Sequence, residues 1–224
     1  MMLWREVVLV AGKDLRIEAR SRVTVQQVLP FGLVVLLLFA FALDSDKKVL
    51  EQVAPGLFWI TVLLASLLAV SRSYAIEADN GARDGLRLSG LDGPAIFLGK
   101  AAAVAVQLLL LDVVLAICVV VLYGVDLGSL LPLVLATLAA TVGIAVVGTL
   151  YGVLAAGLRV RETLVPLLVL PVVAPVLLGA SRAWDAAIHG IPSDAWTWLA
   201  LLAVFAVLFT AIGMLAFGPL LEES

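Results

Sequence analysis

The chain has 224 residues, of which 63% are hydrophobic and 14% are charged, and its formal net charge is −3. A soluble domain carries about 25% charged residues, so this composition excludes an ordinary soluble protein and indicates an integral membrane protein of one domain. The mild net charge gives no indication of nucleic-acid binding. The single cysteine, Cys118, excludes an intramolecular disulfide and a cysteine-pair metal site.

The first 20 residues alternate apolar and basic side chains at helical spacing. Leu3, Val7, Val10 and Ile17 share one face, and the basic residues Arg5, Lys13, Arg16 and Arg20 oppose it. This pattern predicts an amphipathic helix over residues 2–20 that lies in the membrane interface. The alternative is a charged lead-in that only sets the topology.

Six apolar runs follow, each about as long as a bilayer core requires. A single strand in lipid leaves its backbone groups unpaired, so all six are predicted to be helices. The sequence therefore predicts an all-α membrane protein with one domain over residues 1–224 and spans at about 23–43, 54–70, 101–123, 130–158, 163–180 and 195–217.

The lysines and arginines are distributed unevenly between the connecting segments. Eleven of the 14 lie before the first run, between the second and third, or between the fourth and fifth. Cytoplasmic segments carry this excess in membrane proteins. Both termini and the segment at 71–94 are therefore predicted to be cytoplasmic.

Asp112 lies in the middle of the third run, AAAVAVQLLLLDVVLAICVVVLY. A carboxyl group at this depth costs about 2.5–3.5 kcal/mol on insertion scales, so it needs a partner or a cavity. One interpretation is a contact with substrate or with a proton. The other is an interhelical hydrogen bond to a threonine of the fourth run, for which the candidates are Thr137, Thr141 and Thr149.

Two further patterns concern helix geometry. The stretch GTLYG in the fourth run places Gly148 and Gly152 four residues apart, which predicts close helix packing. The fifth run contains Pro166, Pro171 and Pro175, each of which removes a backbone donor. A kinked or broken helix is expected there, either as a structural kink or as the broken helix of a transporter.

The segment after the fifth run, SRAWDAAIHGIPSDAWTW, is predicted to be an outer loop. Its Trp184, Trp196 and Trp198 are expected to form an interfacial aromatic belt. His189 is the only histidine of the chain, and it is either plain surface or a ligand for heme or a metal.

Motifs for catalysis are missing from the sequence. There is no G-x-x-x-x-G-K-[ST] for nucleotide phosphates, no H-E-x-x-H and no C-x-x-C. We therefore predict no catalytic residues and no bound cofactor, and energy must come from a gradient or from another protein.

The segment Ser71–Pro94 is longer than the two to eight residues that usually join two helices. Asn80-Gly81 is a plausible helix end, and Leu86, Leu88 and Leu91 follow among charged residues. Exposed leucines in such a segment favour contact with a cytoplasmic partner. The alternative is a solvated loop.

Over nearly its whole length the chain resembles the heme exporter protein B (CcmB) family of the cytochrome c maturation system, within the ABC-2-type permeases. The resemblance rests on the opening MMLWREVVLV, on APGLFWITVLLASLLAVSR at 54–72 and on LLVLPVVAPVLL at 167–178. The segment at 71–94 departs from the family pattern at four positions, where Glu, Asp, Leu and Pro are usual: Ser71, Asn80, Arg83 and Gly90.

The resemblance implies that this segment is a coupling loop that meets a partner ATPase (CcmA). The residues assigned to the coupling loop are Tyr74, Glu77, Gly81, Asp84, Leu86, Leu88 and Leu91, and all of them except Leu91 match the family pattern. It also implies a homodimer in the bacterial inner membrane, ATP used only through the partner, heme as the handled substrate, and further partners (CcmC, CcmD and the heme chaperone CcmE). An ABC-2 exporter of a drug or lipid, and a scaffold that transports nothing, are the alternatives.

Overall fold

The computed structural model describes the whole chain except residues 1, 44–45, 80–89, 157–160, 190–191 and 224. The described part is helical and contains no strand, so the predicted all-α class is confirmed. In chain order the elements are α1 (Met2–Ser21), the π-helical turn η1 (Thr24–Val28), α2 (Leu29–Ala42), α3 (Lys47–Asp79), α5 (Gly93–Tyr123), α6 (Leu130–Ala156), α7 (Arg161–Ile188) and α8 (Pro192–Glu223).

Among the described residues, six helical stretches are long and apolar enough to cross a bilayer, as predicted: 24–42, 47–75, 93–123, 130–154, 164–188 and 193–220. Several helices run beyond the apolar runs read from the sequence. Thus α3 begins at Lys47 rather than near residue 54 and ends only at Asp79. Hydropathy measures the length of chain that suits lipid, whereas the helix itself continues into polar residues on either side.

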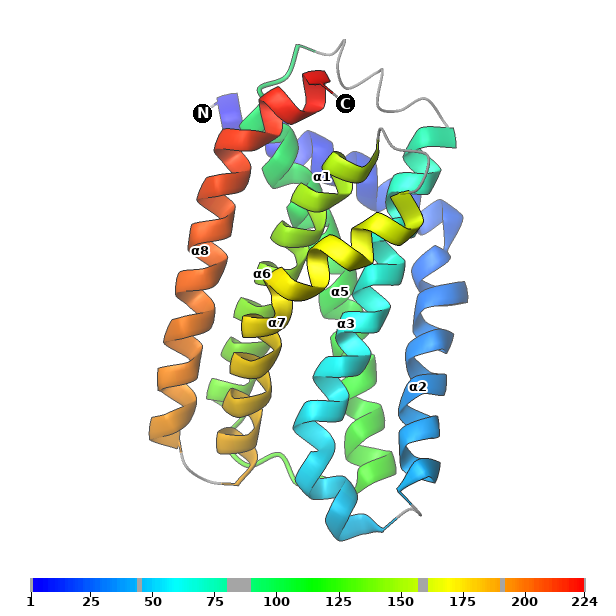
Figure 1. Ribbon diagram of the computed structural model, residues 1–224, viewed down its shortest axis with the longest axis vertical. Helices are drawn as coiled ribbons and strands as arrows, with labels where there is room; N and C mark the ends of the chain where they lie inside the picture. Colours follow the sequence, from blue (N-terminus) through cyan, green and yellow to red (C-terminus); the bar gives the residue numbers. More distant parts are fainter. Residues whose placement is uncertain (1, 44–45, 80–89, 157–160, 190–191, 224) are drawn as a thin grey trace.

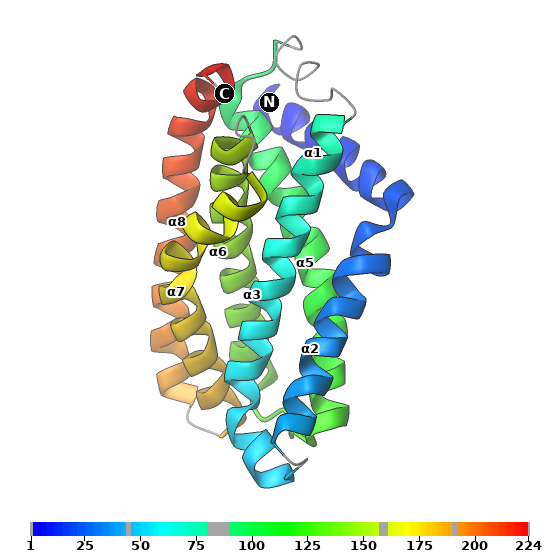
Figure 2. The same cartoon turned by 45° about the vertical axis from the view of Figure 1, so that its right-hand side comes forward.

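The long helices run side by side, and both chain termini lie at the same end of the bundle (Figure 1). Helix α1 crosses this end at an angle to the spans and meets the start of α2 at a corner (Figure 2). An even number of spans returns the chain to the side on which it started, so the two ends share one face of the membrane.

Helix α1 packs on α5 through the apolar face that the sequence predicts. Val7 and Val10 are buried there. The helices approach closely because Gly99 of α5 has no side chain: a Cβ at that position would lie 2.6 Å from the Cβ of Val10. The opposite side of α1 also carries apolar groups, since Trp4 is 71% exposed. A helix with an inward and an outward apolar surface suits the membrane interface.

The three prolines of the fifth run lie inside one unbroken helix, α7, which bends visibly (Figure 1). Pro171 and Pro175 are exposed on the outer surface of the bundle. The helix therefore tolerates the missing donors by bending, as proline predicts.

The prediction that Trp184 belongs to an interfacial belt was wrong. Its segment is not a loop but the last part of α7, and its side chain is 1% exposed. The indole stacks on Phe58 of α3 with ring centroids 4.0 Å apart, and its Nε1 donates a hydrogen bond to Thr137 Oγ1 at 2.9 Å. Continuing the helix rotates this residue toward the core, whereas Trp196 is 45% exposed.

Candidate functional site

A polar junction joins four helices at the end of the bundle that holds the termini. Its centre is Tyr74 of α3, which is 9% exposed. The Tyr74 hydroxyl donates a hydrogen bond of 2.8 Å to the backbone carbonyl of Thr149 in α6. The ring lies over Gly152, where any Cβ would overlap it, and Gly148 faces Val70 one turn away. The G-x-x-x-G pattern thus serves close packing of α6 on α3, as the sequence indicated.

An ion pair extends the junction to α1 and α5. Lys100 Nζ of α5 lies 5.5 Å from the centroid of the Tyr74 ring and 3.7 Å from Asp14 Oδ2 of α1. The other carboxylate oxygen of Asp14 is 2.8 Å from Lys13 Nζ. The Lys100 and Asp14 side chains are only 7% and 12% exposed. Buried charges need such partners, because removing one charged group leaves the other unpaired in a poorly solvated site.

Sequence reasoning missed this pair. Lys100 is one of the basic residues between the second and third apolar runs, which are predicted to be cytoplasmic, although it lies inside α5, which begins at Gly93. The signal for it is the apolar stretch AIFLG between Pro94 and Lys100, which already places the lysine past the start of a span. Asp14 carries no comparable signal, since its role depends on how α1 folds over α5.

Asp112 lies in the core of the bundle and is 2% exposed. Its Oδ2 accepts a hydrogen bond of 2.6 Å from Thr141 Oγ1, so one of the three candidate threonines is its partner. Thr137 instead accepts from the indole of Trp184. The second oxygen of Asp112, Oδ1, is buried and has no hydrogen-bond partner among the described residues. The arrangement is an interhelical bond between α5 and α6.

We expect Asp112→Asn to keep the α5–α6 contact, because an amide oxygen still accepts from Thr141. Asp112→Leu is expected to lower the stability of the bundle by about 0.6 kcal/mol and by no more than about 1.7 kcal/mol, the average and the maximum found for interhelical hydrogen bonds in a membrane protein. Thermal unfolding of the purified protein in detergent measures the difference in stability between the variants. Thr141→Val, which removes the donor of the same hydrogen bond, is the matched variant. Wild-type stability and full activity in Asp112→Leu would exclude both a bonding and a functional role.

The residues assigned to the coupling loop divide into three groups. Gly81, Asp84, Leu86 and Leu88 lie outside the described residues, and for Glu77 only its place in α3 is described. Leu91 precedes α5 and is partly buried against the core. Tyr74 differs from the expectation: it is inside the bundle, so it is not available to a partner and instead anchors the end of α3.

His189 directly follows α7, which ends at Ile188 on the side of the bundle opposite the termini (Figure 1). Its Nδ1 is 3.1 Å from Asp185 Oδ1 and 3.0 Å from the Asp185 carbonyl oxygen, and the side chain is 43% exposed. Among the described residues no three His, Cys, Asp or Glu side chains are grouped to hold a metal ion. The pair is a local contact within one helical turn.

Six apolar helices tied together by buried polar contacts define a polytopic α-helical membrane protein. Comparison with known protein families then identifies the family. The family model for CcmB protein matches residues 5–224, and the chain belongs to that family.

Characterised relatives match over most of their own length. The chain is 30% identical to heme exporter protein B of Haemophilus influenzae over 195 residues, 85% of each chain. It is 32% identical to heme exporter protein B of Escherichia coli K12 over 198 residues, covering 88% of this chain and 87% of the relative. With heme exporter protein B of Pseudomonas aeruginosa the identity is 27% over 209 residues, covering 93% and 94%.

Proposed function

We propose that this chain is the permease subunit of an ABC-type complex of the bacterial inner membrane that handles heme for cytochrome c maturation. The observation that carries the proposal is the family match over residues 5–224, together with relatives named heme exporter protein B. The helical bundle supplies the transmembrane part, and a partner ATPase supplies the energy, since the sequence has no nucleotide-binding loop of its own.

The ATPase docks on the segment that follows Tyr74, with Leu86 and Leu88 as apolar anchors and Glu77 and Asp84 as polar contacts. Two observations support this place. Helix α3 ends at Asp79 and α5 begins at Gly93, both at the end of the bundle where the polar junction ties α1, α3, α5 and α6 together. A movement of the docked ATPase at this end of the bundle is therefore transmitted to all four helices.

The complex contains two copies of this chain with two ATPase subunits, and heme-handling membrane subunits similar to CcmC and CcmD. Within it, heme is either exported or already bound to a periplasmic chaperone similar to CcmE, which ATP hydrolysis releases. The second mechanism is favoured by the histidine content: the only histidine, His189, is exposed and paired with Asp185. In either case this chain is not the enzyme of the complex.

Reconstituted complex in vesicles distinguishes the two mechanisms. ATP hydrolysis is expected to rise several-fold when the heme-loaded chaperone is present on the periplasmic side, and to respond weakly to free heme. Accumulation of heme across the vesicle membrane without the chaperone would identify a pump instead. ATP hydrolysis that responds to neither, but to a drug or lipid, would contradict the heme assignment.

The proposed orientation places both termini in the cytoplasm. Single cysteines at Asp46 and Asp194, both exposed, are expected to react with an impermeant maleimide added to intact cells, after Cys118 has been replaced by Ala. A cysteine at Asp92, exposed at the opposite end, is expected to react only after the membrane is permeabilised. The reverse labelling pattern would invert the topology.

A further inference from the structure

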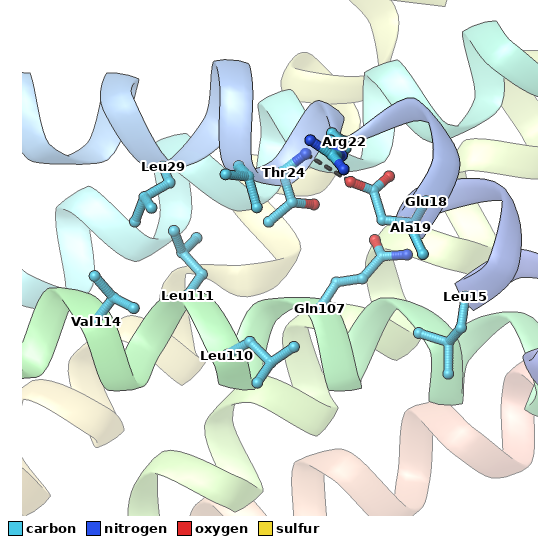
Figure 3. Close-up of a pocket in the computed structure, with 11 residues that line it drawn as sticks. Leu15, Glu18, Ala19, Arg22, Thr24, Leu29, Gln107, Leu110, Leu111 and Val114 are labelled. Atoms are coloured by element: carbon cyan, nitrogen blue, oxygen red, sulfur yellow. Dashed lines mark hydrogen bonds between the residues drawn. The ribbon is translucent and has the colours of Figure 1, made fainter.

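A groove opens on the outer surface where α1, η1 and α2 face α5 (Figure 3). Its volume is about 510 Å³, within the roughly 300–1,000 Å³ of sites that bind small molecules. Leu29, Leu111 and Val114 line the part that runs along α2 and α5, and Leu110, which is 66% exposed, also lines the groove (Figure 3). This part of the groove is apolar and suits a hydrocarbon chain.

The other part of the groove is polar and lies at the corner between α1 and α2. Glu18, Arg22, Thr24 and Gln107 meet there (Figure 3). The Glu18 carboxylate is already engaged, because its Oε1 accepts the Thr24 backbone N–H at 2.6 Å and so caps the start of the first span. Arg22 stands at the corner itself, in a left-handed conformation with φ 53°.

The charge around this corner is positive. Arg16, Arg20 and Arg22 are all exposed. None of the three forms an ion pair with a carboxylate in the part of the chain that the structure describes. Of the three, only Arg22 lines the groove, and Glu18 carries the only carboxylate among the lining residues. Arginine binds phosphate well because its planar guanidinium offers several donors in a fixed arrangement, so the corner is complementary to an anionic headgroup.

We propose that this groove binds an anionic phospholipid. One acyl chain lies along Leu29, Leu111 and Val114, and the headgroup phosphate meets Arg22. The corner between α1 and α2 lies nearer to the end of the bundle that holds both termini than to the other end (Figure 2), so the lipid comes from that leaflet. Each basic residue near an anionic lipid surface contributes enough to change binding about fivefold. A bound lipid would fix the angle at which α1 meets the first span.

The test uses the purified full-length protein in detergent with equal amounts of phosphatidylglycerol and phosphatidylcholine, and native mass spectrometry counts the retained lipid. Wild type is expected to retain phosphatidylglycerol in excess, and the excess falls with salt. Arg22→Gln is expected to reduce it about fivefold, and Arg22→Lys to preserve most of it. Arg5→Gln is the matched control, since it removes an exposed arginine from the far end of α1.

A second variant tests the apolar part of the groove. Leu110→Trp fills it and is expected to lower retention of both lipids, whereas Leu215→Trp, at a site 81% exposed on α8, leaves retention unchanged. The proposal is overturned if wild type shows no preference for phosphatidylglycerol, or if Arg22→Gln behaves like Arg5→Gln. A partner polypeptide retained in place of lipid overturns it equally.

Discussion

Replacing Leu86 and Leu88 together by aspartate is expected to abolish co-purification of the partner ATPase while the protein still inserts in the membrane. In protein interfaces a few buried anchors carry most of the binding, each about 2 kcal/mol or more. Two anchors lost together therefore weaken binding by about 4 kcal/mol, or roughly a thousandfold. Aspartate also puts charge where the proposed interface excludes water.

The control for this experiment is Arg87→Ala, which removes a charge from the same segment. A charge at the rim of an interface mainly changes the association rate, so this variant is expected to keep the ATPase. Insertion of each variant is checked by its yield in the membrane fraction. If the double variant inserts normally and retains the ATPase at the wild-type level, these leucines are not the docking anchors.

The spans were predictable because lipid imposes one strong requirement. Every backbone group must be paired inside the segment, so a long apolar run has to be a helix. What hydropathy does not give is the rotation of each helix about its axis. Trp184 illustrates this limit: its place after an apolar run indicated a loop, and only the continued turn of α7 brings it onto Phe58.

The hydrogen-bond partner of Asp112 can be predicted from the positions of Asp112 and the threonines along their helices. The residue lies eleven positions before the end of α5 at Tyr123, and Thr141 lies eleven positions after the start of α6 at Leu130. In two antiparallel helices joined by a short connection, residues equally far from it lie at the same depth. Register therefore selects Thr141 over Thr137 and Thr149, in agreement with the observed bond.

The ion pair of Asp14 with Lys100 and the groove at Arg22 were beyond such reasoning. Both depend on the angle at which α1 crosses the bundle, and this angle follows from the close contact of Val10 with Gly99 and from the left-handed turn at Arg22. A glycine in an apolar run can have many roles, and a positive φ at an arginine is rare, so neither feature can be read from the sequence. Their effect appears only when the helices are placed in three dimensions.

Gly152→Ala is expected to have the largest effect of any single methyl group added to the polar junction. Its Cβ would overlap the ring of Tyr74, which is buried and has little room to move. Overpacking of this kind costs about 1–3 kcal/mol. Displacing the ring also breaks the hydrogen bond to the Thr149 carbonyl, worth about 1 kcal/mol. Thermal unfolding in detergent measures the loss of stability.

Gly56→Ala in α3 is the matched control. A Cβ at Gly56 meets nothing within 4 Å, so the change is expected to stabilise the helix slightly, as alanine does relative to glycine. Because both variants add one methyl group to a helix, the difference between them isolates the contact with Tyr74. Gly152→Ala that is as stable as Gly56→Ala would contradict the close packing of α6 on α3.

A double-mutant cycle then separates the ring of Tyr74 from its hydroxyl. Tyr74→Phe keeps the ring, so Gly152→Ala should still destabilise the protein in that background, although the hydrogen bond is already absent. Tyr74→Ala removes the ring, and Gly152→Ala should then cost almost nothing. Because α3 leads directly into the proposed docking segment, the same variants are expected to lower ATPase co-purification in the order of their instability. An equal cost of Gly152→Ala in all three backgrounds would mean that the ring does not fill this space.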